Sequence, residues 1–151
     1  MNDIAKPMEN ISSLITFQVG GERFCTDMEN IVQIIDPSEL NKDKELNSEY
    51  SHINLGVIKV PVIDLHKIAG FKLKKISKNN RILIVNIDHN NFAIWVDQVD
   101  NIYTLSHDLN IEIEFNGNEE QTYLKGVINF KEQKMFLLDL RGLLLTDKNI
   151  N

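Results

Sequence analysis

The sequence repeats itself in its two halves, and this repeat restricts the fold more than any other feature. Phe24 can be placed over Phe92 so that the segments around them align without gaps. The segments that then coincide are Leu14–Val19 with Ile82–Ile87 and Gly20-Gly21 with Asp88-His89. Half of a 151-residue chain buries so little apolar surface that its stability alone would be marginal. We therefore expect two small subdomains that share a joint core.

The later parts of the two halves also correspond. The matching segments are Gly56-Val57-Ile58 with Gly126-Val127-Ile128 and Val62–Leu65 with Leu137–Leu140. Asp64 and Asp139 therefore occupy equivalent positions at the ends of two predicted strands. We expect their carboxylates to accept backbone N–H bonds in the turn that follows each strand. A paired-carboxylate site for acid–base chemistry is the alternative.

Short β-branched runs separated by turn residues indicate an all-β fold, either a barrel or a sandwich. The continuous apolar run Ile82–Val85 predicts a strand covered on both faces. Pro61 is expected at a sheet edge, a bulge or a strand start, because proline cannot donate to a ladder. Residues 38–52 are predicted to form a loop with at most a helical turn, and Arg141–Leu145 a short closing helix.

Charge and cysteine content exclude several classes of protein. The net charge of −6 argues against binding to nucleic acid, and the single Cys25 cannot form an internal disulfide. Cys25 is expected to be a small, inert core residue. No apolar stretch is long enough to span a membrane. From Asp88 to Glu120 there are eight acids and no Lys or Arg. This acidic band is either a solvated rim or a device that steers a basic partner.

Catalysis and metal binding are not indicated. The four histidines do not show metal-ligand spacing, and the seven glycines are too dispersed to form a phosphate loop. His66 is expected to be a polar residue at a strand end. The segment from Lys72 to Arg81 is basic and is expected to be a solvated linker. We therefore expect no enzyme activity, no metal and no cofactor.

Several short motifs, taken in order, resemble those of CheW-like domains. They are Gly21–Phe24 followed by Ile31–Ile35, Pro61–Leu65, Ile94–Val99 with Ala93 in place of a glycine, Tyr123–Val127, and Leu137–Leu140. The resemblance implies one domain over residues 13–146, built of two SH3-like five-stranded β-barrels and a short C-terminal helix. Subdomain one would span about 13–70 and subdomain two about 80–140, after a flexible N-terminus at 1–12.

The resemblance also implies a function. Such domains are non-enzymatic adaptors in chemotaxis, and they couple the cytoplasmic tips of transmembrane chemoreceptors to the regulatory domain of the histidine kinase CheA. The protein would then be cytoplasmic and associated with receptor arrays, without inserting into the membrane. The residues implied in partner binding are Ile31, Val32, Gln33, Ile35, Gly56, Lys59, Val99 and Ile102. Alternation along a strand predicts that Ile31 and Gln33 are partly exposed on one face.

One departure from the family pattern concerns an arginine. The family sequence before the proline reads G-V-x-N-L-R-G-x-x-x-P, whereas this chain reads Asn54-Leu55-Gly56-Val57-Ile58-Lys59-Val60-Pro61. Either the N-L-R-G turn is deleted, or Asn54-Leu55-Gly56 is that turn without its arginine. The match of Gly56 with Gly126 favours the deletion, which would shorten the first barrel at one end. A divergent CheW-like module with another protein partner and a small-molecule-binding β-barrel are the alternative functions.

Trp95 allows two interpretations. By the two-residue period of a strand, either Trp95 or its neighbours face the core. Trp95 is then a core or inter-barrel residue, or an exposed aromatic anchor at a partner surface.

Overall fold

The computed structural model describes residues 6–7, 11–40, 52–71, 76–105, 112–115, 123–130 and 132–146. The strands are β1 (Lys6–Pro7), β2 (Ser13–Val19), β3 (Glu22–Asp27), β4 (Ile31–Ile35), β5 (His52–Leu55), β6 (Ile58–Ile63), β7 (Arg81–Ile87), β8 (Asn90–Val96), β9 (Gln98–Thr104), β10 (Glu112–Phe115), β11 (Leu124–Phe130) and β12 (Gln133–Leu138). The helices are the 3₁₀ turns η1 (Met28–Asn30) and η2 (Pro37–Glu39) and the α-helices α1 (Leu65–Ile68) and α2 (Leu140–Thr146).

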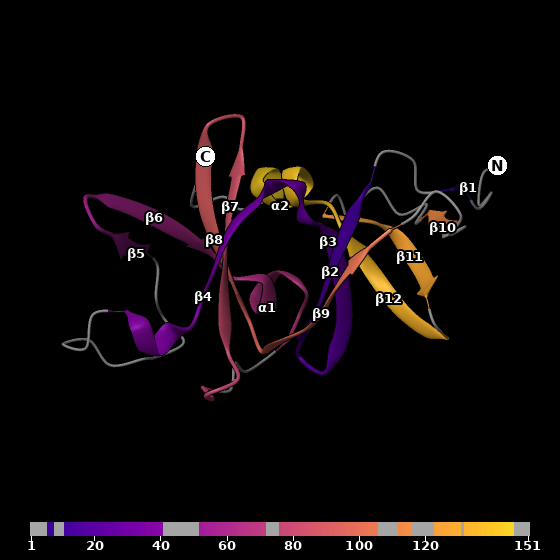
Figure 1. Cartoon of the computed structure of the whole chain (residues 1–151), viewed down its shortest axis with the longest axis horizontal. Coiled ribbons are helices and arrows are strands. Elements are labelled where there is room, and N and C mark those ends of the chain that lie inside the picture. Colours follow the sequence, from indigo (N-terminus) through magenta and orange to yellow (C-terminus); the bar gives the residue numbers. More distant parts are fainter. Residues whose placement is uncertain are drawn as a thin grey trace. The chain divides into compact units, whose positions relative to one another are not determined.

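The all-β prediction is confirmed, because the described elements are mostly strands arranged in two curled sheets (Figure 1). The seven-stranded sheet has the order β1-β10-β11-β12-β3-β2-β9, and the five-stranded sheet has the order β4-β7-β8-β6-β5. The predicted closing helix is also confirmed, as α2.

Contacts divide the chain into two compact units, and each is discontinuous in sequence. The first comprises residues 1–16, 22–29 and 101–151, and the second comprises 17–21 and 30–100. The two halves of the repeat exchange strands. In the first unit β12 pairs in parallel with β3, placing Leu137 opposite Cys25. In the second unit β6 pairs in parallel with β8, placing Val62 opposite Ala93. The subdomain bounds 13–70 and 80–140 describe the repeat and stay a prediction.

The repeat is visible in the burial of equivalent strands. β2 and β7 share one burial pattern, in which the second to fifth residues and the last are buried. Both following turns take positive φ at two successive residues, with values of 62° and 84° at Gly20 and Gly21 and of 50° and 68° at Asp88 and His89. Such turns match the twist of a hairpin. At Gly20 a Cβ atom would also lie 2.4 Å from the ring of Phe71, so this position requires glycine.

The repeat-related carboxylates close equivalent turns, as predicted. Asp64 Oδ1 accepts the amide N–H of Lys67 at 3.1 Å and caps α1. Asp139 Oδ1 accepts the amide N–H of Gly142 at 3.1 Å in the first turn of α2. Each aspartate thus satisfies an amide that a helix start leaves without an intrahelical partner.

Each unit has its own cluster of buried apolar side chains. In the first unit the cluster is Leu14, Cys25, Ile128, Phe130, Met135 and Leu137. In the second unit it is Ile35, Ile53, Val60, Ile82, Ile84, Ala93 and Trp95. Trp95 is 1% exposed, so its interpretation as a core residue is correct and the exposed anchor is wrong.

Three local expectations need correction. Pro61 lies inside β6, at the point where the strand changes partner: it is the last residue of β6 to pair with β5, and Val62 is the first to pair with β8. His66 lies buried in α1, which the apolar run before it concealed. Lys6–Pro7 pair with β10, although residues 1–12 were expected to be unstructured. Of the predicted loop 38–52, residues 41–51 lie outside the described part.

Candidate partner-binding site

A β-bulge in β4 produces the first candidate surface. Ile31 pairs with Val85 on β7, and Gln33 pairs with Ile84, so β4 advances by two residues where β7 advances by one. The extra residue, Val32, interrupts the alternation of the strand. As a result Val32, Gln33 and Ile34 are all exposed, with Val32 exposed by 60% and Ile34 by 36%. We call these three residues the β4 surface.

The predicted exposure of Ile31 is wrong. Ile31 and Ile35 are buried at the two ends of β4, and Ile35 belongs to the core cluster of the second unit. Gln33 is exposed as predicted. Strict alternation would place Ile31, Gln33 and Ile35 on one face, but the bulge separates Gln33 from the two isoleucines. Ile34 was missed for the same reason, and the sequence offers no signal for the bulge.

The turn between β5 and β6 is not shortened, which corrects the alignment with the family pattern. Leu55 pairs with Ile58, leaving the two-residue turn Gly56-Val57, with Gly56 at φ 62°. The equivalent hairpin has Phe130 opposite Gln133, which also leaves two residues in its turn. Gly126 stands four residues before Phe130, and the residue four before Leu55 in the sequence is Ser51 and not Gly56. The N-L-R-G turn is therefore present, with Gly56 and Val57 in the places of its arginine and glycine.

This hairpin tip forms the second candidate surface. Val57 is fully exposed and Ile58 is 52% exposed, and both Gly56 and Lys59 are exposed beside them. We call Gly56, Val57, Ile58 and Lys59 the tip surface. It lies between β5 and β6, at the opposite end of the strand order from β4. Clustered exposed aliphatic side chains of this kind are typical of protein-binding surfaces.

The two remaining predicted residues lie on β9 and belong to different units. Val99 is half-buried in the second unit, and Ile102 is 54% exposed in the first. Val99 lines a small pocket with Asn79, Arg81 and Gln98, all of which belong to the second unit. The structure therefore brings together Val32 with Gln33, and Gly56 with Lys59, while Ile31 and Ile35 belong to the interior.

Asp97 holds together the end of the second unit at which β8 ends. Its Oδ2 accepts the amide N–H of Gly20 at 2.7 Å, and its Oδ1 lies 2.8 Å from Nε2 of His66. Its backbone oxygen accepts Nδ2–H of the buried Asn80 at 3.0 Å. Asp97 belongs to the motif Ile94–Val99, and its role here is structural. A lone aspartate in a motif does not reveal which turns it connects.

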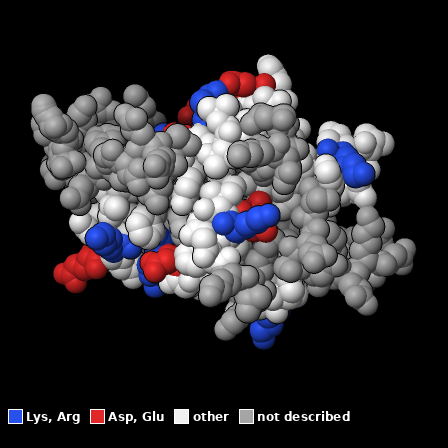
Figure 2. Space-filling view, turned by 180° about the vertical axis from the view of Figure 1, so that it is seen from behind, with Lys and Arg blue, Asp and Glu red and all other residues white. Residues whose placement is uncertain are grey.

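The single thiol of the chain lies in surroundings that suppress its reactivity. Burial raises the pKa of the Cys25 thiol to about 12, so the reactive thiolate is suppressed. Within the described ranges no group of three His, Cys, Asp or Glu residues could hold a metal ion. Figure 2 shows basic and acidic side chains interspersed among uncharged ones on the face that it draws. Most of the acidic residues from 106 to 120 lie outside the described residues.

The described part of the chain contains no helix with the length and apolar character needed to cross a membrane.

The described elements and the sequence repeat define a duplicated all-β fold, and comparison with known proteins identifies its family. Residues 13–148 match the CheW-like domain. The chain therefore belongs to the CheW-like domain family, and its fold is that of CheW with SH3-like subdomains. The crystal structure of the scaffolding protein TtCheW from Thermoanaerobacter tengcongensis is similar, with a TM-score of 0.72 and 21% identity over 97% of each chain. A comparison with curated proteins gave no match.

Proposed function

We propose that this protein is a chemotaxis coupling scaffold, which joins the cytoplasmic tips of chemoreceptors to the histidine kinase CheA. Membership of the CheW-like family over residues 13–148 supports this function. The observation that carries it is the β4 surface, which presents Val32 and Gln33, two residues that the family resemblance implies in partner contact, with the exposed Ile34 beside them. The protein acts by binding alone, in the cytoplasm at receptor arrays, without a metal or cofactor.

A scaffold that joins two proteins needs two separate contact surfaces. The β4 surface and the tip surface are separate in the strand order, since β4 and β5 are the first and last strands of the five-stranded sheet. Each presents exposed aliphatic side chains, which lose water on binding and so contribute free energy in proportion to the buried apolar area. We infer that one surface contacts the kinase and the other contacts the receptor.

A second candidate function is that of a CheW-like adaptor for a different protein partner. It is favoured by one observation: Gly56 and Val57 occupy the places of the family's Arg-Gly pair. Arginine offers a rigid fork of donors to a partner carboxylate, and glycine followed by valine offers none. A partner that binds an apolar tip would suit this chain better than one that requires the guanidinium.

Co-sedimentation tests the proposal. The full-length protein is mixed with chemoreceptor cytoplasmic fragments and CheA from the same organism, assembled on lipid vesicles, and each component is omitted in turn. We expect the protein to sediment with the assembly and to increase the CheA that sediments. The variant Val32→Asp should lose this effect. Ile76→Asp is the matched control, because Ile76 is an exposed aliphatic residue outside both surfaces.

If the wild-type protein stays in the supernatant while CheA and receptor sediment together, the coupling function is wrong. Equal losses in Val32→Asp and Ile76→Asp would show that the β4 surface is not the contact.

A further inference from the structure

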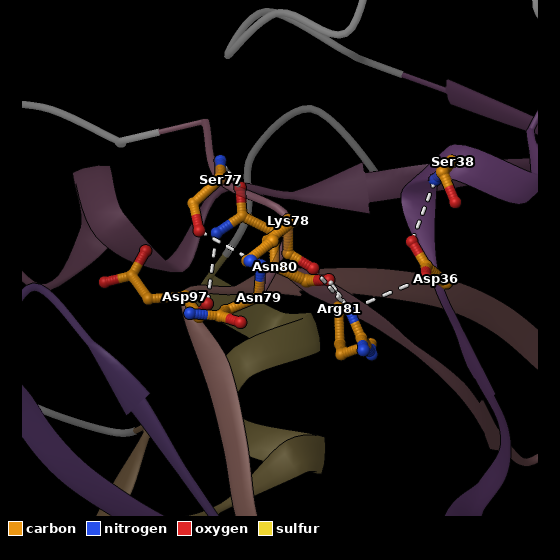
Figure 3. A network of polar contacts seen from close by, with 8 residues as sticks. All are labelled: Asp36, Ser38, Ser77, Lys78, Asn79, Asn80, Arg81 and Asp97. Carbon is orange, nitrogen blue, oxygen red and sulfur yellow. Dashed lines mark hydrogen bonds and ion pairs between the residues drawn. The ribbon is translucent and has the colours of Figure 1, made fainter.

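A pocket in the second unit lies beside the polar network of Arg81 and is not used by either candidate surface. Its volume is about 220 Å³, and Asn79, Arg81, Gln98 and Val99 line it. Arg81 begins β7 and Asn79 lies in the turn before it, while Gln98 and Val99 begin β9. Figure 3 shows Arg81 and Asn79 in this network, with Asp36 on the neighbouring strand end.

The guanidinium of Arg81 is held by backbone oxygens. Its Nη1 donates to the carbonyl oxygens of Lys78 at 3.0 Å and of Asn80 at 2.7 Å. Asn80 is itself 1% exposed and is fixed by its bonds to Ser77 and Asp97, each 3.0 Å long. The arginine is therefore anchored to a rigid turn before any ligand arrives, and little side-chain freedom is lost on binding.

This anchoring leaves the other edge of the guanidinium available. Arginine has five N–H donors, of which Nη1 carries two. Within the described part of the chain the polar contacts of Arg81 are the two carbonyl bonds and the ion pair with Asp36, and all three involve Nη1. The donors on Nε and Nη2, which form one side of the fork, have no partner there.

Asp36 does not neutralise this arginine. Its Oδ2 lies 3.8 Å from Nη1, and both side chains are about one-third exposed. Such a pair contributes little to stability. The pKa of Asp36 lies below its ordinary value chiefly because the Ser38 backbone amide donates to its carboxylate at 3.0 Å, and Arg81 has the smallest effect of the groups involved. The carboxylate thus has its own donor.

We propose that this pocket binds a carboxylate, with Nε and Nη2 of Arg81 donating to its two oxygens and the side-chain amide of Asn79 donating beside them. The backbone N–H of Asn79 donates to Ser77 Oγ at 3.0 Å, and its side-chain amide makes no bond within the described residues, whereas the side-chain amide of Gln98 donates to Asp100 at 2.8 Å. An arginine fork matches the planar geometry of a carboxylate. The nearby Asp36 and Asp100 disfavour a dianion, so a monoanionic carboxylate fits better than phosphate. The ligand is either a free carboxylate or a Glu or Asp side chain of a partner.

Solution NMR of the full-length ¹⁵N-labelled protein tests the pocket. Sodium acetate is titrated against sodium chloride at equal ionic strength, and the Nε–Hε signal of Arg81 and the side-chain amide signal of Asn79 are followed. A second titration uses a peptide with blocked termini and one glutamate, compared with the same peptide carrying glutamine. We expect saturable shifts of both signals with acetate and not with chloride. If the glutamate peptide binds and the glutamine peptide does not, the source is a partner side chain. If acetate binds and neither peptide does, the source is a free carboxylate.

Three variants keep the test decisive. Arg81→Lys retains the charge but removes the fork, and it should weaken acetate binding at least fivefold; Asn79→Ala should weaken it about threefold while the Arg81 signal still responds. Lys78→Gln removes a neighbouring exposed charge and should leave the affinity unchanged. The proposal is overturned if chloride and acetate shift the signals equally. It is also overturned if Arg81→Lys and Asn79→Ala bind acetate as tightly as the wild type, or if Lys78→Gln loses as much affinity as they do.

Discussion

The carboxylate of Asp97 contacts the imidazole of His66, with 2.8 Å between Oδ1 and Nε2, in the second unit. A carboxylate only accepts, so Nε2 of His66 carries the proton of this bond. The other carboxylate oxygen accepts the amide of Gly20 at 2.7 Å. One side chain at the end of β8 therefore ties down α1 and the turn after β2, and both of its partners are donors.

We expect Asp97→Asn to destabilise the protein, although the substitution preserves shape. An amide oxygen can accept from Gly20, but the NH₂ group then faces Nε2 of His66, whose proton must move to Nδ1, a buried atom without a hydrogen-bond partner among the described residues. The loss should be about 1–3 kcal/mol of the free energy of unfolding. Urea denaturation measures it, with Glu29→Gln, an exposed acid on η1, as the control that should change stability by less than about 0.5 kcal/mol. A change in Asp97→Asn as small as the control's would mean that the two contacts are not needed.

Cys25 predicts a pH dependence of stability. Burial raises the pKa of its thiol from 9.0 to about 12, so above pH 9 the folded state keeps a proton that the unfolded chain loses. Stability therefore falls as the pH rises through this range, by about 1.4 kcal/mol per unit. Between pH 8 and pH 10 the wild type should lose about 1.4 kcal/mol more than Cys25→Ala, measured by urea denaturation. Parallel pH profiles for the two proteins would contradict the burial of the thiol.

The bulge in β4 predicts opposite effects for adjacent residues. Ile31→Asp places a charge at a buried position and should cost about 4 kcal/mol of stability. Val32→Asp changes an exposed residue and should cost about 1 kcal/mol or less, yet weaken partner binding at least tenfold. Thermal unfolding and isothermal titration calorimetry with the CheA regulatory domain and with receptor fragments separate the two effects. If Val32→Asp binds both partners as well as the wild type, the β4 surface is not a contact.

Much of the fold could be predicted from the sequence repeat. Turn residues and apolar runs recur in the same order, so the hairpins and the capping role of Asp64 and Asp139 followed from local chemistry. The exchange of strands between the halves did not follow, because the parallel pairing of β3 with β12 is a long-range choice among similar apolar strands. Helix α1 was hidden for a different reason: four residues are too few to show a helical period, and the apolar strand residues before them suggest that the strand extends to Leu65.

The candidate site was harder to predict than the fold. The bulge at Val32 depends on how β4 pairs with β7, and no residue in β4 marks it. The position of Gly56 shows how a sequence match can mislead: Gly-Val-Ile recurs at Gly126, but Gly56 lies in the turn of its hairpin whereas Gly126 lies within β11. The two cases depend on pairing registers, that of β4 with the distant β7 and that of the local hairpin of β5 with β6.

The tip surface predicts what an arginine would add. Because the turn between β5 and β6 has its full length, the family's pair can be restored by the double substitution Gly56→Arg with Val57→Gly, without any insertion. Gly56 has a φ of 62°, which strains any other residue, so the free energy of unfolding of each variant is measured beside its affinity. If a partner presents a carboxylate there, affinity should rise by about 1–2 kcal/mol, roughly tenfold. Gly56→Lys with Val57→Gly is the matched control and should gain less, because an ammonium lacks the fork. Equal affinities for the wild type and both variants would show that the partner does not contact the side chain at this position.

The rate of CheA autophosphorylation tests the central claim most directly. The kinase is assayed with receptor fragments on vesicles, with and without the full-length protein, and again with the protein but without receptor. A coupling scaffold should raise the rate only when receptor and kinase are both present, and receptor ligand should then change that rate. A rate that is the same with and without the protein, while the protein remains folded, would contradict coupling and favour an adaptor for another partner.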